Sequence, residues 1–224
     1  MTEHQLEVLR DAATAALRGA ELIAETAGEA IAARGSFALA ASGGTDPWEI
    51  YRQLAEFEIE WERVDVFQVD ERIAPDGDPD RNLTHLLESL PEAARDRVRA
   101  MPVTDEDLEG AVARYAQQLP DSLDLVHLGL GPDGHTASLV PGDPVLEVDD
   151  RRVAITDPYQ GHPRMTLTYP ELERARRIFW LVTGESKRDA LGWLLARDRA
   201  IPAGRVQAHE SIVIADEAAA GPSA

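Results

Sequence analysis

Apolar residues recur at spacings of three and four from Leu6 to Ile31, and beyond Gly35 they gather in short runs. The first pattern is one face of an amphipathic helix and predicts a long helix that ends near Gly35. Short apolar runs at 64–69, 123–128 and 178–182 predict strands, of which the last is the clearest. Weaker patterns predict strands at 36–40, 152–155, 165–168 and 212–214, and helices from about 46 and over 83–90, 105–119 and 185–197.

This alternation of strands and helices predicts an α/β fold, with a largely parallel, twisted sheet flanked by helices. The chain shows no internal repeat and no linker long enough to separate domains. We therefore expect a single domain over residues 1–224, with a core at about 10–215 and a frayed tail at 217–224. The polar segments 74–80 and 141–151 are expected to be surface excursions.

The charge balance narrows the class of partner. The chain has 22 basic and 41 acidic residues, a net charge of −19, which argues against nucleic acid and anionic membranes as partners. No apolar run approaches the roughly 20 residues of a membrane span, and the first five residues do not resemble a secretory signal. Cysteine is absent, which excludes disulfides and thiolate metal sites. We expect a cytoplasmic protein, monomeric or weakly dimeric, without a metal or a cofactor.

Two polar segments follow predicted strands, where open α/β sheets bind their ligands. Ser42-Gly43-Gly44-Thr45 precedes a helix, and its backbone N–H groups could cradle a phosphate. A plain tight turn is the alternative. Asp70-Glu71-Arg72 follows the 64–69 strand, and three adjacent charges there could bind a ligand or could begin a solvated loop. Asn82 could contact the ligand or cap the next helix.

The segment 129–138 carries the strongest chemical signal. It contains a formal G-x-G-x-x-G pattern, but Asp133 places a negative charge where pyrophosphate would lie, and the following segment contains Pro141 and Pro144. Acid–base chemistry is the better interpretation, because His135 can titrate near neutral pH and Asp133 could orient it. A solvated or capping histidine is the alternative. We expect structural roles for the other internal histidines, at positions 85, 127, 162 and 209.

Two cations complete the candidate site. Arg164 lies with Thr166 in a predicted strand, and Lys187 lies in the first turn of a helix after Gly184. Cations usually favour the other end of a helix, so Lys187 suggests a bound anion. Arg164 could add a bidentate phosphate contact. Taken singly, either residue could be an ordinary surface cation.

With these segments in place, the chain resembles the 6-phosphogluconolactonases, which share a sugar-phosphate isomerase-like fold with the glucosamine-6-phosphate isomerases/deaminases. The most specific match is Leu128-Gly129-Leu130-Gly131-Pro132-Asp133-Gly134-His135-Thr136-Ala137-Ser138-Leu139. The segments Ser42-Gly43-Gly44, Asp70-Glu71-Arg72, Arg164-Met165-Thr166-Leu167 and Gly184-x-x-Lys187 match in the family's order, and the likeness covers about 10–215.

The resemblance implies hydrolysis of 6-phospho-D-glucono-1,5-lactone in the oxidative pentose phosphate pathway, with no metal required. His135 would transfer the proton with Asp133 beside it, and Arg72 would contact the substrate. The expected ligand-binding residues are Ser42, Gly43, Gly44, Thr45, Asp70, Glu71, Asn82, Gly131, Gly134, Arg164 and Lys187. Of these, Gly43, Gly44, Arg164 and Lys187 would surround the phosphate.

Three positions depart from the family pattern. Asp46 stands where Thr is usual, Arg81 replaces the Ser of a common Ser-Asn pair, and Val140 replaces a Phe. The amino-sugar-phosphate deaminases carry a Glu at the position of Val140, which argues against that activity. An NAD-dependent enzyme is disfavoured by Asp133 and by the mid-chain position of the glycine loop. A non-catalytic sugar-phosphate sensor could dispense with His135, which this chain keeps.

Overall fold

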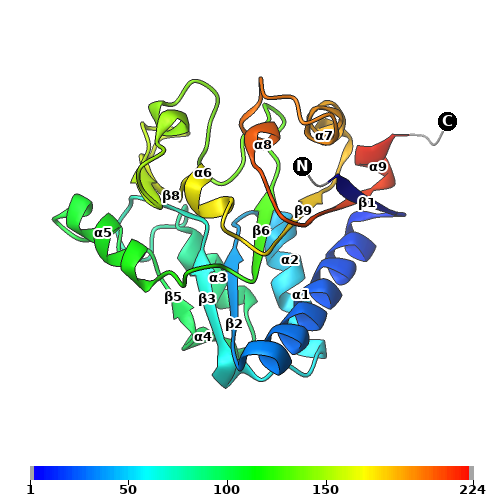
Figure 1. Cartoon of the computed structure of the whole chain (residues 1–224), viewed down its shortest axis with the longest axis horizontal. Helices are drawn as coiled ribbons and strands as arrows, with labels where there is room; N and C mark the ends of the chain where they lie inside the picture. The colour runs from blue at the N-terminus through cyan, green and yellow to red at the C-terminus, as the bar shows by residue number, and fades with distance from the viewer. Residues whose placement is uncertain (1–2, 222–224) are drawn as a thin grey trace.

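The computed structural model describes residues 3–221 and contains two sheets (Figure 1). The larger sheet is wholly parallel, with the strand order β1-β10-β9-β6-β2-β3-β5. Its strands are β1 (His4–Leu9), β2 (Phe37–Ala41), β3 (Val64–Gln68), β5 (Val98–Arg99), β6 (Leu125–Gly129), β9 (Arg177–Val182) and β10 (Ser211–Asp216). The predicted α/β fold with a largely parallel sheet is confirmed.

The smaller sheet is antiparallel and has the order β4-β8-β7. Its strands are β4 (Asp70–Arg72), β7 (Val153–Ile155) and β8 (Arg164–Leu167). Because β4 follows β3 after a single residue, the small sheet begins where β3 of the large sheet ends. The alternative in which Asp70-Glu71-Arg72 begins a solvated loop does not hold, since pairing with β8 makes this polar segment a strand.

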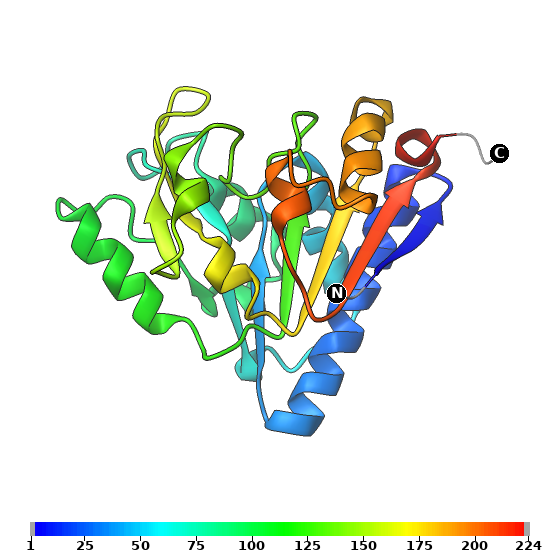
Figure 2. The same cartoon turned by 45° about the horizontal axis from the view of Figure 1, so that its top comes forward.

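Helices cover both faces of the large sheet (Figure 2). Alternate strand residues point to opposite faces, so Phe179 and Leu181 of β9 join one buried cluster and Trp180 and Val182 join the other. The first cluster packs against α1 (Ala12–Arg34), α2 (Thr45–Gln53), α3 (Asn82–Ser89) and α4 (Glu92–Arg95). The second includes the small sheet, α5 (Leu108–Gln118), α6 (Tyr169–Leu172), α7 (Arg188–Leu195), α8 (Pro202–Arg205) and α9 (Glu217–Ala220). Four short 3-10 turns lie at Leu54–Glu56, Trp61–Arg63, Pro144–Glu147 and Glu185–Lys187.

The two ends of the chain differ from the sequence prediction. The long helix begins only after Asp11, whose carboxylate accepts a hydrogen bond from the Thr14 N–H at 2.8 Å. The residues before this cap form the edge strand β1, so the prediction of a helix from Leu6 is wrong. The end of α1 at Gly35 is confirmed, with φ at +82°. At the other end, Asp216 caps α9, which replaces the first part of the predicted frayed tail; residues 222–224 lie outside the described part.

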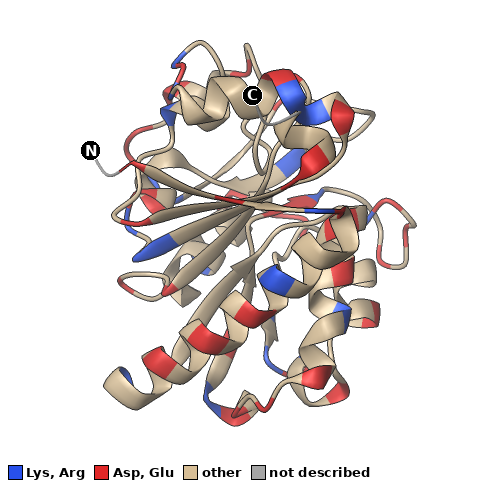
Figure 3. Cartoon of the chain, turned by 90° about the vertical axis from the view of Figure 1, so that its right-hand side faces the viewer, with Lys and Arg blue, Asp and Glu red and all other residues tan. Residues whose placement is uncertain are grey.

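The predicted surface excursions have different structures. Residues 74–80 form a loop without helix or strand, as predicted. In 141–151 the prediction is wrong in part, because Val145 and Leu146 are buried in the second cluster. Acidic residues are spread over the helices and loops with Lys and Arg interspersed (Figure 3). No helix within residues 3–221 combines the length and the apolar character needed to cross a bilayer.

Candidate active site

A cavity of about 320 Å³ opens at the carboxyl ends of β2, β6 and β9, with the small sheet as one wall. This is the edge at which parallel α/β sheets bind ligands. The predicted residues that line it are Ser42, Gly43, Gly44, Thr45, Asp70, Arg72, Asn82, Gly131, His135, Arg164 and Lys187. Segments separated by more than 140 residues therefore meet around one space.

The Ser42–Thr45 loop joins β2 to the N-terminus of α2 at the cavity. A Cβ on Gly43 would lie 2.2 Å from Oδ1 of Asn82, so only glycine allows this close approach. The buried Tyr51 hydroxyl of α2 donates to the Ser42 carbonyl at 3.1 Å and so holds the loop against this helix. The first turn of α2 leaves its backbone N–H groups without intrahelical partners, which gives the cavity a surface suited to an anion.

The loop after β6 presents His135 from a closed turn. The Gly131 N–H donates to the His135 carbonyl at 2.8 Å, and the Gly134 N–H donates to the Gly131 carbonyl at 2.9 Å. Gly134 has φ at +80°, a conformation that L side chains rarely adopt, and it packs against Ile201. The Thr136 hydroxyl donates to the Gly129 carbonyl at 2.9 Å and ties the loop to its strand. Gly134 thus shapes the turn and does not line the cavity.

Asp133 and His135 form a carboxylate–imidazole pair. Asp133 Oδ1 lies 2.5 Å from Nδ1 of His135, and the His135 backbone N–H donates to the same oxygen at 3.2 Å. Partial burial acts to raise the pKa of Asp133, but the hydrogen bonds and the charge of His135 outweigh it and hold that pKa below its ordinary value. A proton on Nδ1 directed at this carboxylate leaves Nε2 as a proton acceptor. Asp133 therefore orients the imidazole without lining the cavity itself.

Tyr159 packs beside this pair. Its hydroxyl donates to Asp133 Oδ2 at 3.4 Å, and its ring meets the His135 ring edge-on with centroids 5.5 Å apart. The guanidinium of Arg164 lies 5.1 Å from the centre of the Tyr159 ring. Gln160, the next residue, lines the cavity, and its Oε1 accepts from Arg164 Nη2 at 3.3 Å. Tyr159 and Gln160 therefore join the histidine side of the site to the arginine side.

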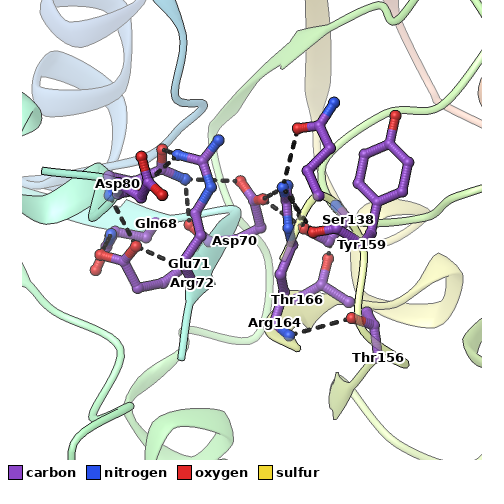
Figure 4. A network of polar contacts seen from close by, with 12 residues as sticks. Gln68, Asp70, Glu71, Arg72, Asp80, Ser138, Thr156, Tyr159, Arg164 and Thr166 are labelled. Atoms are coloured by element: carbon purple, nitrogen blue, oxygen red, sulfur yellow. Dashed lines mark hydrogen bonds and ion pairs between the residues drawn. The ribbon is translucent and has the colours of Figure 1, made fainter. Parts of the chain in front are cut away.

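The small sheet supplies a connected set of charged groups. Figure 4 shows Asp70 between the guanidinium groups of Arg72 and Arg164. Asp70 Oδ2 accepts from the Ser138 hydroxyl at 2.5 Å and lies 3.8 Å from Nη1 of Arg164. Arg72 donates to the Asn82 side-chain oxygen, and the Asn82 amide donates to the Asp70 carbonyl at 3.1 Å. Burial lowers the pKa of Arg164, which nevertheless stays charged at any physiological pH.

Glu71 lies behind this wall and is fully buried. Its carboxylate accepts the backbone N–H groups of Arg72 at 2.7 Å, Asn82 at 2.8 Å and Leu83 at 2.8 Å. It also pairs with Arg81, whose Nε is 3.2 Å away. Glu71 is not among the residues that line the cavity, so the expectation that it binds the ligand directly does not fit its position. It holds β4 against the N-terminus of α3 and so positions Arg72 and Asn82.

Lys187 enters from the 3-10 turn Glu185–Lys187, after β9. Gly184 precedes it with φ at +88°, and its N–H donates to Asp216 at 3.0 Å. Burial lowers the pKa of the Lys187 ammonium, while Asp46 and Asp133 act in the opposite direction. Within residues 3–221 no hydrogen bond or ion pair engages this ammonium. Lys187 is therefore a half-buried cation available to an anion in the cavity.

Several functional positions had no clear sequence signal. Tyr159 and Gln160 precede β8 in a segment without a helix or strand pattern, and Thr183 directly follows β9 as an ordinary polar residue. Of the predicted structural histidines, His127 is fully buried, stacks on Phe179 and lies 2.7 Å from the Tyr51 hydroxyl. His85 contacts the Pro79 carbonyl at 2.8 Å, and His162 contacts Asp80 at 3.1 Å.

Two other types of site do not fit this geometry. The Gly129–Gly134 turn is followed by an isolated bridge between Thr136 and Leu139, so it lacks the helix N-terminus that a dinucleotide-binding loop requires. Across the described range 3–221, no group of three or more His, Asp or Glu side chains is arranged to hold a metal ion. The cavity instead offers three cations and one oriented imidazole.

Comparisons with known proteins identify the family of the chain. The sequence profile of the family "Glucosamine-6-phosphate isomerases/6-phosphogluconolactonase" matches residues 10–214. A 6-phosphogluconolactonase of Nostoc is 33% identical over 96% of both chains, and one of Synechocystis is 39% identical over 75% of both. A crystal structure of 6-phosphogluconolactonase from Thermotoga maritima superposes with a TM-score of 0.87 at 26% identity, covering 96% of this chain and all of that one.

Proposed function

Because the chain belongs to the family of glucosamine-6-phosphate isomerases and 6-phosphogluconolactonases, we propose that it hydrolyses 6-phospho-D-glucono-1,5-lactone to 6-phosphogluconate in the oxidative pentose phosphate pathway. The observation that carries the proposal is the Asp133–His135 pair, set in a cavity that also holds Arg72, Arg164 and Lys187. The pair suits water activation, and the cations suit a phosphorylated substrate.

The phosphate is proposed to bind at the Gly43–Gly44 loop, between Lys187 and Arg164. The start of α2, Arg164 of β8 and Lys187 of the turn after β9 line the same cavity. In a protein with a net charge of −19, this local positive surface is what allows an anionic substrate to bind. Fixing the remote phosphate holds the lactone ring in register with His135.

His135 is proposed to act first as a base and then as an acid. Its Nε2 takes a proton from water as the water oxygen attacks C1 of the lactone. The tetrahedral intermediate then breaks the bond from C1 to the ring oxygen, and the same nitrogen returns the proton to that oxygen. Proton transfer of this kind is worth about 10²–10⁴-fold in rate. Asp133 stabilises the imidazolium that exists between the two steps.

The negative charge that develops on the C1 oxygen needs a donor. Arg72 lines the cavity and donates to the side-chain oxygen of Asn82. Donors already fixed in place are effective because they do not reorganise during the reaction. Arg72 is the proposed charged donor, since Glu71 and Asn82 both fix its position.

The deaminase branch of the family is the alternative. Position 140, where that branch carries a Glu, is here a buried valine, which cannot act on His135 as a charged group. The relatives from Nostoc, Synechocystis and Streptomyces coelicolor, at 33–39% identity, are named 6-phosphogluconolactonase. A monomeric glucosamine-6-phosphate deaminase of known structure has a TM-score of 0.82 but only 19% identity, which is a likeness of fold alone.

The proposal is tested by titrating the acid released from fresh 6-phosphogluconolactone in a pH-stat. Hydrolysis well above the spontaneous rate is expected, with no ammonia released from glucosamine 6-phosphate. Ammonia release, or lactone opening at only the spontaneous rate, would overturn the proposal. Unphosphorylated gluconolactone in the same assay measures how much of the activity depends on the phosphate.

A further inference from the structure

A carboxylate lies among the groups proposed to bind phosphate. Asp46 is the second residue of α2 and lines the cavity together with Gly43, Gly44 and Lys187. The hydroxyl of the buried Thr183, at the end of β9, donates to Asp46 Oδ2 and directs the carboxylate. Asp46 therefore stays beside the anion-binding surface in spite of its negative charge.

Asp46 differs from the two other carboxylates of the site in how it is compensated. Asp70 lies 3.8 Å from Arg164 and accepts from Ser138, and Asp133 is paired with His135. The bonded partner of Asp46 is a neutral hydroxyl, and within residues 3–221 it forms no ion pair. Its charge therefore acts on the cavity itself, where it interacts with the Lys187 ammonium.

Opening the lactone changes the charge of the bound molecule. The substrate carries only the phosphate charge, whereas the product carries the same phosphate and a new carboxylate. A cavity with Arg72, Arg164 and Lys187 attracts the product more strongly than the substrate, because attraction grows with the charge of the ligand. A fixed negative charge at the phosphate weakens the binding of both molecules and limits how long the product is retained.

We propose that Asp46 weakens the binding of phosphate in this site and thereby favours release of 6-phosphogluconate. The inference rests on the proposed function. It explains why an acidic residue is compatible with a phosphate site, since Asp46 offsets part of the field of Lys187. Removing this charge should tighten the binding of phosphorylated ligands and of simple divalent anions alike.

The variant Asp46→Asn tests this charge, with Glu49→Gln as the matched control. Glu49 lies three residues along the same helix, binds Arg52 and Gln53 and does not line the cavity, so both variants lose one negative charge. We expect Asp46→Asn to lower the inhibition constant of 6-phosphogluconate and the Kd of sulfate on the order of tenfold, since each 1.4 kcal/mol is a factor of ten. Glu49→Gln should leave both constants within about twofold of wild type, because exposed charges are screened.

Two further variants separate charge from structure. Asp46→Thr removes the charge with a different side chain and should tighten sulfate binding as Asp46→Asn does. Thr183→Val removes the hydroxyl partner but keeps the Asp46 charge, and it should not tighten sulfate binding. Unchanged or weaker binding in both Asp46 variants, or equal tightening in Glu49→Gln, would overturn the proposal. Absence of lactone hydrolysis in the wild type would refute the proposed function, while sulfate titration would still decide the effect of Asp46.

Discussion

The two sheets contribute to the cavity in opposite ways. The loops at the carboxyl edge of the large parallel sheet present side chains that can still bind a ligand. His135 has 22% of its side chain exposed, and the Lys187 ammonium is unpaired within residues 3–221. The small antiparallel sheet presents groups already engaged by the protein. Asp70, Glu71 and Arg164 of this sheet are all buried. Glu71 accepts a hydrogen bond from the Asn82 backbone N–H, and Asp70 accepts one from the Ser138 hydroxyl. The side chains on the large-sheet loops are therefore free to react, whereas those of the small sheet are held in place by the protein.

This difference predicts which substitutions affect turnover and which affect the free energy of unfolding. A group that exchanges protons must have a free nitrogen or oxygen, so replacing it should alter turnover and leave the fold intact. A buried charge that is fully bonded is costly to disturb, because its partner then remains buried and unpaired. Substitutions on the large-sheet loops should therefore lower activity alone, and substitutions in the small sheet should also lower the free energy of unfolding.

The largest effect on turnover is expected at His135. His135→Ala removes the proposed base and should lower kcat by about 10²–10⁴-fold, because water must then attack without a proton acceptor. Binding of 6-phosphogluconate, measured by calorimetry, should be nearly unchanged, and so should the unfolding midpoint. Near-wild-type turnover in this variant would exclude His135 as the proton-transfer residue.

The largest effect on stability is expected at Glu71, in the small sheet. Glu71→Gln keeps the shape but removes the buried partner of Arg81 and leaves only the exposed Asp76, and breaking a buried pair costs about 3–5 kcal/mol. Urea unfolding followed by circular dichroism measures this loss. Unchanged stability, with activity lost, would instead mean that Glu71 acts on the ligand.

Arg164 and Lys187 sharpen the comparison because they lie on opposite walls and serve one proposed ligand. Each charged contact to phosphate is worth about 1.5–3 kcal/mol, so either Arg164→Ala or Lys187→Ala should lower kcat/KM for the phosphorylated lactone roughly 10- to 150-fold. Hydrolysis of unphosphorylated gluconolactone should change little. Only Arg164→Ala should also destabilise the fold, since only Arg164 is buried and bonded. Equal losses on both lactones would show that neither residue binds phosphate.

The buried His127 predicts how the fold beneath the large-sheet loops responds to acid. Burial lowers its pKa from 6.5 to about 3, so between these values the unfolded chain binds a proton that the folded chain excludes. The free energy of unfolding therefore falls as the pH drops below about 6.5, by a factor of at most about ten in the folding equilibrium per pH unit. His127→Gln should flatten this dependence in urea titrations between pH 4 and 7. An equally steep dependence in the variant would assign it to other groups.

The smallest effect is expected from a chelator. Neither wall within residues 3–221 offers a cluster of ligands for a metal ion, and the chain has no cysteine. Treatment with a strong chelator should leave kcat/KM unchanged. Loss of activity that a divalent ion restores would show that the site uses a metal after all.

The large sheet could be predicted because each of its main strands is a short apolar run between polar segments. β4 could not, because Asp70-Glu71-Arg72 is wholly polar and becomes a strand only through pairing with β8, about 95 residues later. β1 was missed because Leu6 and Leu9 also fit a helical spacing, and only the Asp11 cap shows where the helix begins. In both cases the missing information lay in distant or capping contacts.

The residues of the site also divide into those with a local sequence signal and those placed by distant contacts. The glycine loops and the His135 motif could be predicted from the sequence, because tight turns and close backbone approaches require particular residues. The role of Glu71 could not be predicted from the sequence, where it is only one of three charged residues after a strand. In the structure its buried carboxylate binds three backbone N–H groups. Gln160 lines the cavity, and Tyr159 packs beside His135, only through the connection between β7 and β8, which no local pattern specifies.

The pairing of β1 with β10 has a consequence for how the chain is made. His4 to Leu9 are in register with Ser211 to Asp216, and the Ser211 hydroxyl contacts both His4 and Trp180. β1 thus depends on a strand that is synthesised more than 200 residues after it. Pairing over such a separation is slow, and the apolar Leu6 and Val8 stay unpaired meanwhile. β1 therefore cannot pair with β10 until almost all of the described chain has been synthesised.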